Sequence, residues 1–553
     1  MLPSRLNLLF LLCVLVVLAA ALGPVLGARP PRPAEERDTL RIELVEGETK
    51  SFYVKIVNPD PTPADWTIRI SPALAQLEFS AIAGRLNPGE RCEVKFTVTG
   101  RRIGDYETIV SVQTSSGILK DRITRAIITV YSNPATQSLF LLSRARLARF
   151  FPDSADVVLA CLENFADHYD IQGVIINVDS SPHVADAYQH WDQGDNWSSA
   201  YYANQVAFAI DQYLEKQLRR YLHIKYIIII GDDAIIPYHR ISDQSTRGFQ
   251  ESNYIAHKPG FTTGAAVDSN LILTDDLYAD LEEEFSPTYL SLPFEHIVSR
   301  LVKSPTQITK QLEAFLEYGP EIPVHSIFVS SGDYSDSSAI FDLKDCADSI
   351  VGVYGNCFGH GHVFSQFIQN REICANYDLS AFASTFLSRR FDLYSINNHA
   401  YHTGFFMPQH TMLTVKRLAQ ELPALNRSIV HTVGCHTGMT NTSPVEHLWD
   451  FPSVFAQKGV AAYIANTAYS ISSALGVNRS ERLQVGIARH IGQGEPVGDA
   501  LRNAKHDYWH SRNPNETNPH DDLKVILSIS LFGLPYYRCV DYDYRFDVAR
   551  STR

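Results

Sequence analysis

The spacing of apolar and polar residues changes about a quarter of the way along the 553-residue chain. Between residues 38 and 132 the two kinds alternate in short runs, and turn formers such as Asn58-Pro59-Asp60-Pro61 separate the runs. Alternation with period two is typical of strands that bury one face, and turns at this spacing favour an antiparallel sandwich. We therefore predict an all-β, immunoglobulin-like sandwich over residues 38–132. Its expected strands are residues 39–45, 50–57, 65–70, 91–99, 106–113 and 125–130.

After residue 132 the pattern changes to short runs that are apolar throughout, separated by amphipathic segments of helix length. Strands that are apolar on both faces and alternate with helices indicate a parallel sheet that is covered on two sides. We therefore expect a three-layer α/β unit and divide it into residues 139–320 and residues 321–545. The expected strands are residues 173–178, 226–230, 326–330, 392–396, 429–433 and 460–465, and the expected helices are residues 204–221, 306–318 and 413–422.

The N-terminal segment follows neither pattern. Arg5 precedes an uncharged apolar run from Leu8 to Leu22, and small residues follow it, which is the layout of a secretory signal peptide. We predict a signal peptide at residues 1–27 and a linker at residues 28–37. The protein is then expected to be exported, secreted or at the cell surface, with no membrane span once the leader is cleaved. An uncleaved N-terminal anchor is the alternative.

Composition narrows the function classes. With 45% hydrophobic and 20% charged residues, the chain has the composition of a folded globular protein. The formal net charge is −13, and no segment concentrates Lys and Arg, so we expect no nucleic-acid partner. Seven cysteines lie after the predicted leader. Because this number is odd, a free thiol, an intermolecular bridge and a complete lack of disulfides all remain open.

Two consecutive predicted strands are followed by residues with catalytic chemistry. His399 follows residues 392–396, and Cys435 follows residues 429–433. A crossover between two such strands makes them parallel neighbours, and sites in open α/β sheets lie beyond the carboxyl ends of the strands. An imidazole beside a thiol lowers the thiol pKa and can protonate a leaving group, so the pair suits acyl transfer. We expect the backbone N–H groups of Cys435 and Ala400 to form an oxyanion hole.

The histidines near Cys435 raise a zinc site as an alternative, because imidazole and thiolate are favoured zinc ligands. Cys435 has no second cysteine within two to four residues, and His399 and His402 do not have the spacing of a helical His-x-x-x-His pair. Zinc is therefore not expected. His402 and His436 remain alternatives to His399 as the acid–base group.

The segments around the two predicted catalytic residues read INNHAYHTGF at residues 396–405 and IVHTVGCHTG at residues 429–438. Together with flanking segments in the same order, they resemble the gingipain-type cysteine peptidases of the wider caspase-like group. The flanking segments are residues 228–237, 274–280, 298–301, 332–334 and 531–535. The resemblance extends from about residue 139 to residue 540 and implies a caspase-like fold with a mostly parallel sheet in two subdomains.

The resemblance implies that Cys435 is the nucleophile and His399 the general acid–base group of a secreted cysteine endopeptidase. Protein or peptide substrates would be cleaved through a thioester acyl-enzyme, with no cofactor required. The sequence departs from the family pattern at two positions: Ala400 replaces the Gly after the His, and Asn398 replaces a small residue before it. These departures favour the alternative, a catalytically inactive peptidase-fold protein that acts at the surface by interaction.

An acidic segment suggests a structural calcium ion. Asp275, Asp276 and Asp280 precede three consecutive glutamates, and carboxylate oxygens are the ligands that calcium prefers. Gingipain-like relatives are stabilised by calcium, so the resemblance implies the same here. A solvated acidic face is the favoured interpretation of this segment, and the calcium site is the alternative that the resemblance raises.

The specificity for the residue at the scissile bond depends on loops that the pattern does not place. Carboxylates near predicted strand ends can complement an Arg or Lys side chain, and a preference for basic residues is one hypothesis. The candidates are Asp232, Asp233, Asp243 and Asp333.

Overall fold

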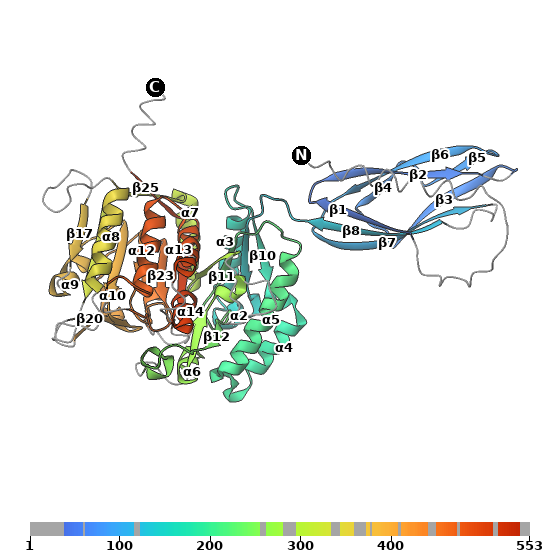
Figure 1. Ribbon diagram of the computed structural model, residues 1–553. Helices are drawn as coiled ribbons and strands as arrows, with labels where there is room; N and C mark the ends of the chain where they lie inside the picture. Colours follow the sequence, from blue (N-terminus) through green and yellow to red (C-terminus); the bar gives the residue numbers. More distant parts are fainter. Residues whose placement is uncertain are drawn as a thin grey trace, which may run out of the picture. The chain divides into compact units, whose positions relative to one another are not determined.

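The chain divides into two units, Met1–Val130 and Tyr131–Arg553, close to the change of pattern near residue 132 (Figure 1). A computed structural model describes residues 38–58, 61–115, 122–254, 262–279, 295–332, 343–358, 372–376, 379–407, 411–440, 449–472, 476–512 and 518–541. The predicted signal peptide and linker therefore lie outside the described residues. Within these ranges, no helix combines the length and the apolar character that a bilayer span needs.

The first unit consists of two β-sheets, as the alternating pattern predicts. One sheet has the order β1-β8-β7-β3-β5 and the other the order β2-β6-β4. The inward side chains of Phe96 and Val98 from β6 and of Ile128 and Val130 from β8 form a common core. The strands are β1 (Asp38–Val45), β2 (Thr49–Val57), β3 (Ala64–Ser71), β4 (Leu77–Phe79), β5 (Ala83–Leu86), β6 (Arg91–Thr99), β7 (Gly104–Thr114) and β8 (Arg122–Tyr131).

The second unit is built on one ten-stranded sheet with the order β10-β9-β11-β14-β24-β23-β22-β18-β16-β17. Most neighbouring strands run parallel, whereas β23 and β24 pair antiparallel. The prediction of an α/β unit with a mostly parallel sheet is confirmed. The strands are β9 (Ser138–Leu142), β10 (Gly173–Asn177), β11 (Tyr226–Ile230), β14 (Ile297–Leu301), β16 (Ser326–Gly332), β17 (Glu372–Asn376), β18 (Leu393–Asn398), β22 (Ile429–Thr432), β23 (Ala462–Asn466) and β24 (Ile529–Gly533).

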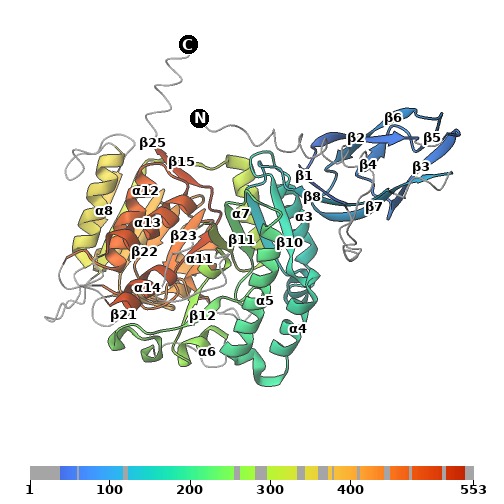
Figure 2. The same ribbon diagram turned by 45° about the vertical axis from the view of Figure 1, so that its right-hand side comes forward.

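Helices cover both faces of this sheet (Figures 1 and 2). Successive residues of β16 show it, because Ile327 and Val329 pack in the core that contains α8 and α12, whereas Phe328 packs in the core that contains α9, α10 and α11. The helices are α2 (Arg144–Phe150), α3 (Ala155–Ala166), α4 (Pro182–Trp191), α5 (Ala200–Leu218), α6 (Thr262–Asp268), α7 (Pro305–Tyr318), α8 (Leu343–Cys357), α9 (Leu379–Ser388), α10 (Val415–Glu421), α11 (Phe451–Gln457), α12 (Ser480–Gly492), α13 (Val497–Ser511) and α14 (Pro519–Leu527).

Short strands lie outside the main sheets. They form the pairs β12 (His239–Ser242) with β13 (Leu271–Thr274) and β15 (Glu321–Val324) with β25 (Arg538–Asp541), and a three-stranded sheet of β19 (Ala400–Tyr401), β20 (Gly404–Met407) and β21 (Thr411–Thr414). The last of these corrects the predicted helix at residues 413–422. Leu413 belongs to β21, and the helix begins after Thr414, whose hydroxyl accepts a hydrogen bond from the Arg417 N–H.

The carboxyl ends of strands from both halves of the sheet meet at one edge. Lys303, which follows β14, lies 3.8 Å from Asp450, which caps the N-terminus of α11 in the segment after β22. As predicted, β18 and β22 are parallel neighbours, with Leu393 opposite Ile429. The residues that follow these two strands therefore share this edge.

A buried ion pair lies on β14, one of the strands that sequence patterning missed. Arg300 interrupts the apolar character of β14, and its guanidinium donates to both oxygens of Asp275 at 2.5 and 3.0 Å and to the carbonyls of Gly231 and Ile236. Both charged side chains are buried. A charged side chain is tolerated in the interior of a sheet when it is paired with an opposite charge and hydrogen-bonded, and each guanidinium nitrogen of Arg300 donates a hydrogen bond.

The described cysteines make no disulfide. Cys92, Cys161, Cys346, Cys357, Cys374, Cys435 and Cys539 are all free thiols. Cys346, Cys357 and Cys374, which lie close enough in the sequence for a local bridge, therefore form none with one another.

We expect Asp275→Ala to destabilise the second unit by about 3–5 kcal/mol, because Arg300 would stay buried without its counter-charge. Urea denaturation followed by tryptophan fluorescence measures this change. Glu421→Ala, which removes the exposed partner of Arg417, is the control and should leave the midpoint nearly unchanged. Equal shifts for both variants would contradict the assigned role of the buried pair.

Candidate active site

His399 and Cys435 line the same cavity, of about 230 Å³, at the carboxyl edge of the sheet. Both side chains are half-buried, and each follows one of the two adjacent strands β18 and β22. The structure thus brings together the two side chains that the sequence singled out. The other lining residues are Gly248, Phe249, Leu343, Asn398, Val433, Gly434, Tyr469, Ser470 and Ser472.

Backbone contacts hold the two loops against each other. The Thr432 hydroxyl at the end of β22 donates to the carbonyl of Ile396 in β18 at 2.8 Å and accepts from the N–H of Gly434 at 3.0 Å. The thiol of Cys435 points toward the carbonyl oxygen of Ser470, 3.9 Å away. The nucleophile candidate therefore leaves the sheet at a position that the neighbouring strand determines.

Gly434 allows the close approach of the loops. A Cβ atom at this position would lie 3.0 Å from the Cβ of Ala400, 2.9 Å from Thr437 Cγ2 and 3.1 Å from the carbonyl oxygen of Asn398. Ala400 itself lies in the short strand β19, and its φ is not positive. The replacement of Gly by Ala after the His therefore places no residue in the left-handed region.

Burial determines the protonation state of both groups. It raises the pKa of the Cys435 thiol above its ordinary value, against the hydrogen bond with Ser470, which lowers it. It lowers the pKa of His399. Near neutral pH, burial therefore favours a neutral thiol and a neutral imidazole in the free protein.

The cavity, its two reactive groups and their adjacent strands are features that a cysteine peptidase needs. A model of peptidase family C25 matches residues 156–539, which is more than half of the chain. The chain belongs to peptidase family C25, the gingipain family. A search of the curated proteins finds no match.

Several solved structures resemble parts of this C25 family member at low sequence identity. A PapD-like domain of human CEP192 shares 16% identity over 20% of this chain and 98% of its own, with a TM-score of 0.16. A Saccharomyces cerevisiae separase–securin complex shares 11% identity over 46% of this chain and 15% of its own, with a TM-score of 0.31. A Porphyromonas gingivalis protein of unknown function shares 13% identity over 16% of this chain and 43% of its own, with a TM-score of 0.15. TM-scores this low carry no functional argument.

Asn398, the other departure from the family pattern, also lines the cavity. Its side-chain oxygen accepts a hydrogen bond from the Ser330 hydroxyl at 2.8 Å. Its Nδ2 group is buried and has no hydrogen-bond partner in the described part of the chain. A buried donor without an acceptor is costly, so this amide is a spare donor next to His399.

The alternative acid–base groups are already engaged elsewhere. His402 Nδ1 lies 2.5 Å from the Tyr254 hydroxyl, and His436 Nε2 lies 2.8 Å from Glu251. Both imidazoles are buried, and neither lines the cavity. Within the described ranges no group of three His, Cys, Asp or Glu side chains gathers in a way that would hold a metal ion.

The carboxylates proposed for basic specificity have structural partners. Asp233 pairs with Arg240 at 2.7 Å, Asp243 pairs with Lys524 at 2.7 Å, and Asp232 is buried and accepts from the N–H of Ala234. None of them lines the cavity at Cys435. The fourth candidate, Asp333, lies outside the described residues.

The acidic segment proposed for calcium is described only in part. Asp275 is paired with Arg300, and Asp276 is paired with Lys505 at 2.7 Å. Asp280 lies outside the described residues, as do the three glutamates after it. The calcium site stays a prediction.

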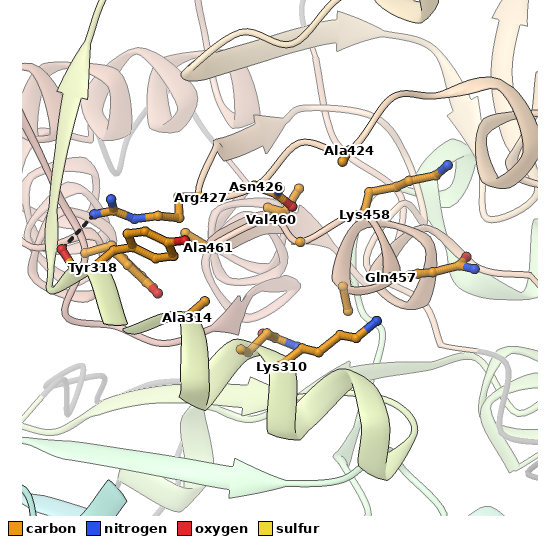
Figure 3. Close-up of a pocket in the computed structure, with 14 residues that line it drawn as sticks. Lys310, Ala314, Tyr318, Ala424, Asn426, Arg427, Gln457, Lys458, Val460 and Ala461 are labelled. Carbon is orange, nitrogen blue, oxygen red and sulfur yellow. Dashed lines mark hydrogen bonds between the residues drawn. The ribbon is translucent and has the colours of Figure 1, made fainter. Parts of the chain in front are cut away.

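A larger cavity, of about 810 Å³, lies where α7, α10 and α11 end (Figure 3). Its basic side chains neutralise helix C-termini, because Arg427 donates to the carbonyls of Tyr318 and Gly319 and Lys458 donates to that of Leu422. Figure 3 shows Arg427 beside the ring of Tyr318. Neither His399 nor Cys435 lines this cavity.

We expect Gly434→Ala to lower the free energy of unfolding by about 1–3 kcal/mol, because the added methyl group cannot fit between the two loops. Gly248→Ala is the matched control, since a Cβ there meets nothing within 4 Å although the residue lines the same cavity. Urea denaturation of both variants tests the comparison. An unchanged midpoint for Gly434→Ala would show that the loops can move apart freely.

We also expect the alkylation of Cys435 by iodoacetamide to rise with pH, with a midpoint above the ordinary thiol value of 9.0, because burial raises the thiol pKa. Peptide mass mapping follows Cys435 separately from the other cysteines. A rate that reaches its plateau below about pH 8 would mean that the thiolate is already stabilised in the free protein.

Proposed function

We propose that this C25 family member is a secreted cysteine endopeptidase that uses Cys435 as its nucleophile and His399 as its general acid–base group. The observation that supports this most is their position on one cavity at the ends of two adjacent parallel strands. Family membership supports a cysteine-type peptidase and therefore protein or peptide substrates.

In the proposed mechanism the neutral imidazole of His399 accepts the thiol proton while the sulfur of Cys435 attacks the peptide carbonyl carbon. The backbone N–H groups of Cys435 and Ala400 stabilise the tetrahedral oxyanion. Its collapse breaks the C–N bond, the imidazolium returns the proton to the amine, and a thioester remains. Water then attacks the thioester with His399 as the base, which releases the acid and restores the thiol. The low pKa of His399 suits the first step, because it keeps the imidazole unprotonated.

We further infer the arrangement around this site from the sequence. Residues 1–27 act as a signal peptide, the first unit is an immunoglobulin-like spacer, and the second unit has a caspase-like fold. Calcium bound near Asp275, Asp276 and Asp280 would act as a structural ion, with no cofactor in the chemistry. The two sheets of the first unit and the mostly parallel sheet of the second support the two fold assignments alone.

A catalytically inactive peptidase-fold interaction protein is the second candidate. The raised pKa of the Cys435 thiol and the presence of Ala400 and Asn398 at positions where the family pattern differs favour it. The two candidates differ in the reactivity of Cys435 and in peptide turnover, so labelling combined with a turnover assay separates them.

We expect a peptidyl acyloxymethyl ketone to modify the native protein at Cys435 alone, and the label to be lost in Cys435→Ala. His399→Ala should slow labelling by about 10²-fold or more, because general acid–base assistance is removed. Intact-mass spectrometry and turnover of a peptide library measure the two effects. Cys161→Ala, which removes a half-buried thiol from α3, is the control and should react as the unmodified protein does. A folded protein without labelling or turnover at any pH or calcium level would establish the inactive alternative.

A further inference from the structure

A buried segment from the first half of the second unit contacts both catalytic loops. Glu251 and Tyr254 lie between β12 and α6, far in sequence from His399 and Cys435, and both side chains are almost completely buried. Neither residue belongs to a motif that the sequence singles out. Their partners include His436, the residue after Cys435, and His402, three residues after His399.

Tyr254 bridges the two loops with one side chain. Its ring stacks on His436, the residue after Cys435, with centroids 3.6 Å apart and planes at 8°. Its hydroxyl accepts a hydrogen bond from the backbone N–H of His402 at 3.0 Å and lies 2.5 Å from His402 Nδ1. Since His402 follows β19, three residues after His399, this phenol ties the segment of the imidazole to the loop of the thiol.

Glu251 holds the loop that carries Cys435 through ionic and hydrogen-bond contacts. Its carboxylate contacts His436 Nε2 at 2.8 Å and Lys524 Nζ at 2.6 Å, and it accepts the backbone N–H of Tyr469, a residue that lines the cavity. Burial acts to raise its pKa, but the charges of His436 and Lys524 lower the pKa of Glu251 to about 2. The carboxylate is therefore ionised near neutral pH.

The backbone at His436 shows why these contacts are needed. Its φ is +56°, in the left-handed region that residues with a side chain rarely adopt. The imidazole is held by the ring of Tyr254, by the edge of Tyr469 at 4.6 Å and by Glu251. The backbone N–H of His436 donates to the carbonyl of Ala468 at 2.9 Å. An unfavourable backbone conformation next to the nucleophile persists only when contacts with the surrounding residues stabilise it.

We propose that Tyr254 and Glu251 are positioning residues that hold the His399 loop and the Cys435 loop in the register required for proton transfer between them. This inference rests on the proposed peptidase function and adds to it the element that sets the geometry of the dyad. Neither residue touches the cavity, so both act through His402 and His436.

The test compares the same substitution at two buried tyrosines, one that joins the two loops and one that lies elsewhere. Tyr254→Phe removes the hydroxyl that joins the loops, whereas Tyr278→Phe removes an equally buried hydroxyl that donates to the carbonyl of Pro237 away from the cavity. In the full-length protein at about pH 7.5, we expect Tyr254→Phe to slow labelling of Cys435 by the acyloxymethyl ketone about ten-fold or more. Tyr278→Phe should change the rate less than about two-fold.

Steady-state kinetics separate positioning from binding. For Tyr254→Phe we expect kcat to fall with KM almost unchanged, because the residues that line the cavity are all retained. Glu251→Gln keeps the shape of the carboxylate, serves as the second variant should Tyr254→Phe fail to fold, and should also reduce kcat more than KM. Circular dichroism establishes that each variant is folded.

Equal slowing in Tyr254→Phe and Tyr278→Phe, or an unchanged rate in Tyr254→Phe, would overturn the inference. His399→Ala measured in parallel distinguishes this result from failure of the proposed function. If His399→Ala is slow while Tyr254→Phe reacts normally, only the positioning role is wrong. If His399→Ala reacts as fast as the unmodified protein, the dyad is wrong and the positioning role fails with it.

Discussion

The second unit depends on a small set of buried charges that must be paired with one another. Lys524 in α14 contacts Asp243 and Glu251, and Glu251 in turn contacts His436 beside the nucleophile candidate. Removing any one of these groups would leave another ionised in a low-dielectric interior, which costs far more than a surface contact contributes. The loop that carries Cys435 is therefore held where it is by the requirement that these charges meet.

The same burial determines the chemistry of the site. Burial raises the pKa of the Cys435 thiol and lowers the pKa of His399, so it favours the neutral form of both groups in the free protein. Catalysis by such a pair depends on how accurately the imidazole is placed to accept the proton as the sulfur attacks. The close contact of Gly434 with Ala400 and the bridge through Tyr254 are physical means of achieving that placement.

Most acidic residues near the ends of the strands serve the fold. Asp233, Asp243 and Asp275 each neutralise a buried cation, and the pair of Asp243 with Lys524 joins segments that lie 281 residues apart in the sequence. A carboxylate that already binds Arg240, Lys524 or Arg300 is not available to select a basic substrate side chain. The described part of the cavity instead presents aromatic, aliphatic and hydroxyl groups.

Local patterning determined much of this protein. The apolar run of β11, the alternation in β6 and the positions of His399 and Cys435 after β18 and β22 all follow from short-range periodicity, which reports what each face buries. Patterning missed β14 because Arg300 breaks its apolar run, and only a partner from another segment makes that arginine tolerable. No local sequence pattern marked Glu251 or Tyr254 as functional, since their partners lie more than a hundred residues away. The tertiary structure alone decided those contacts, because pairing of buried charges and rings depends on proximity in space and leaves no period along the chain.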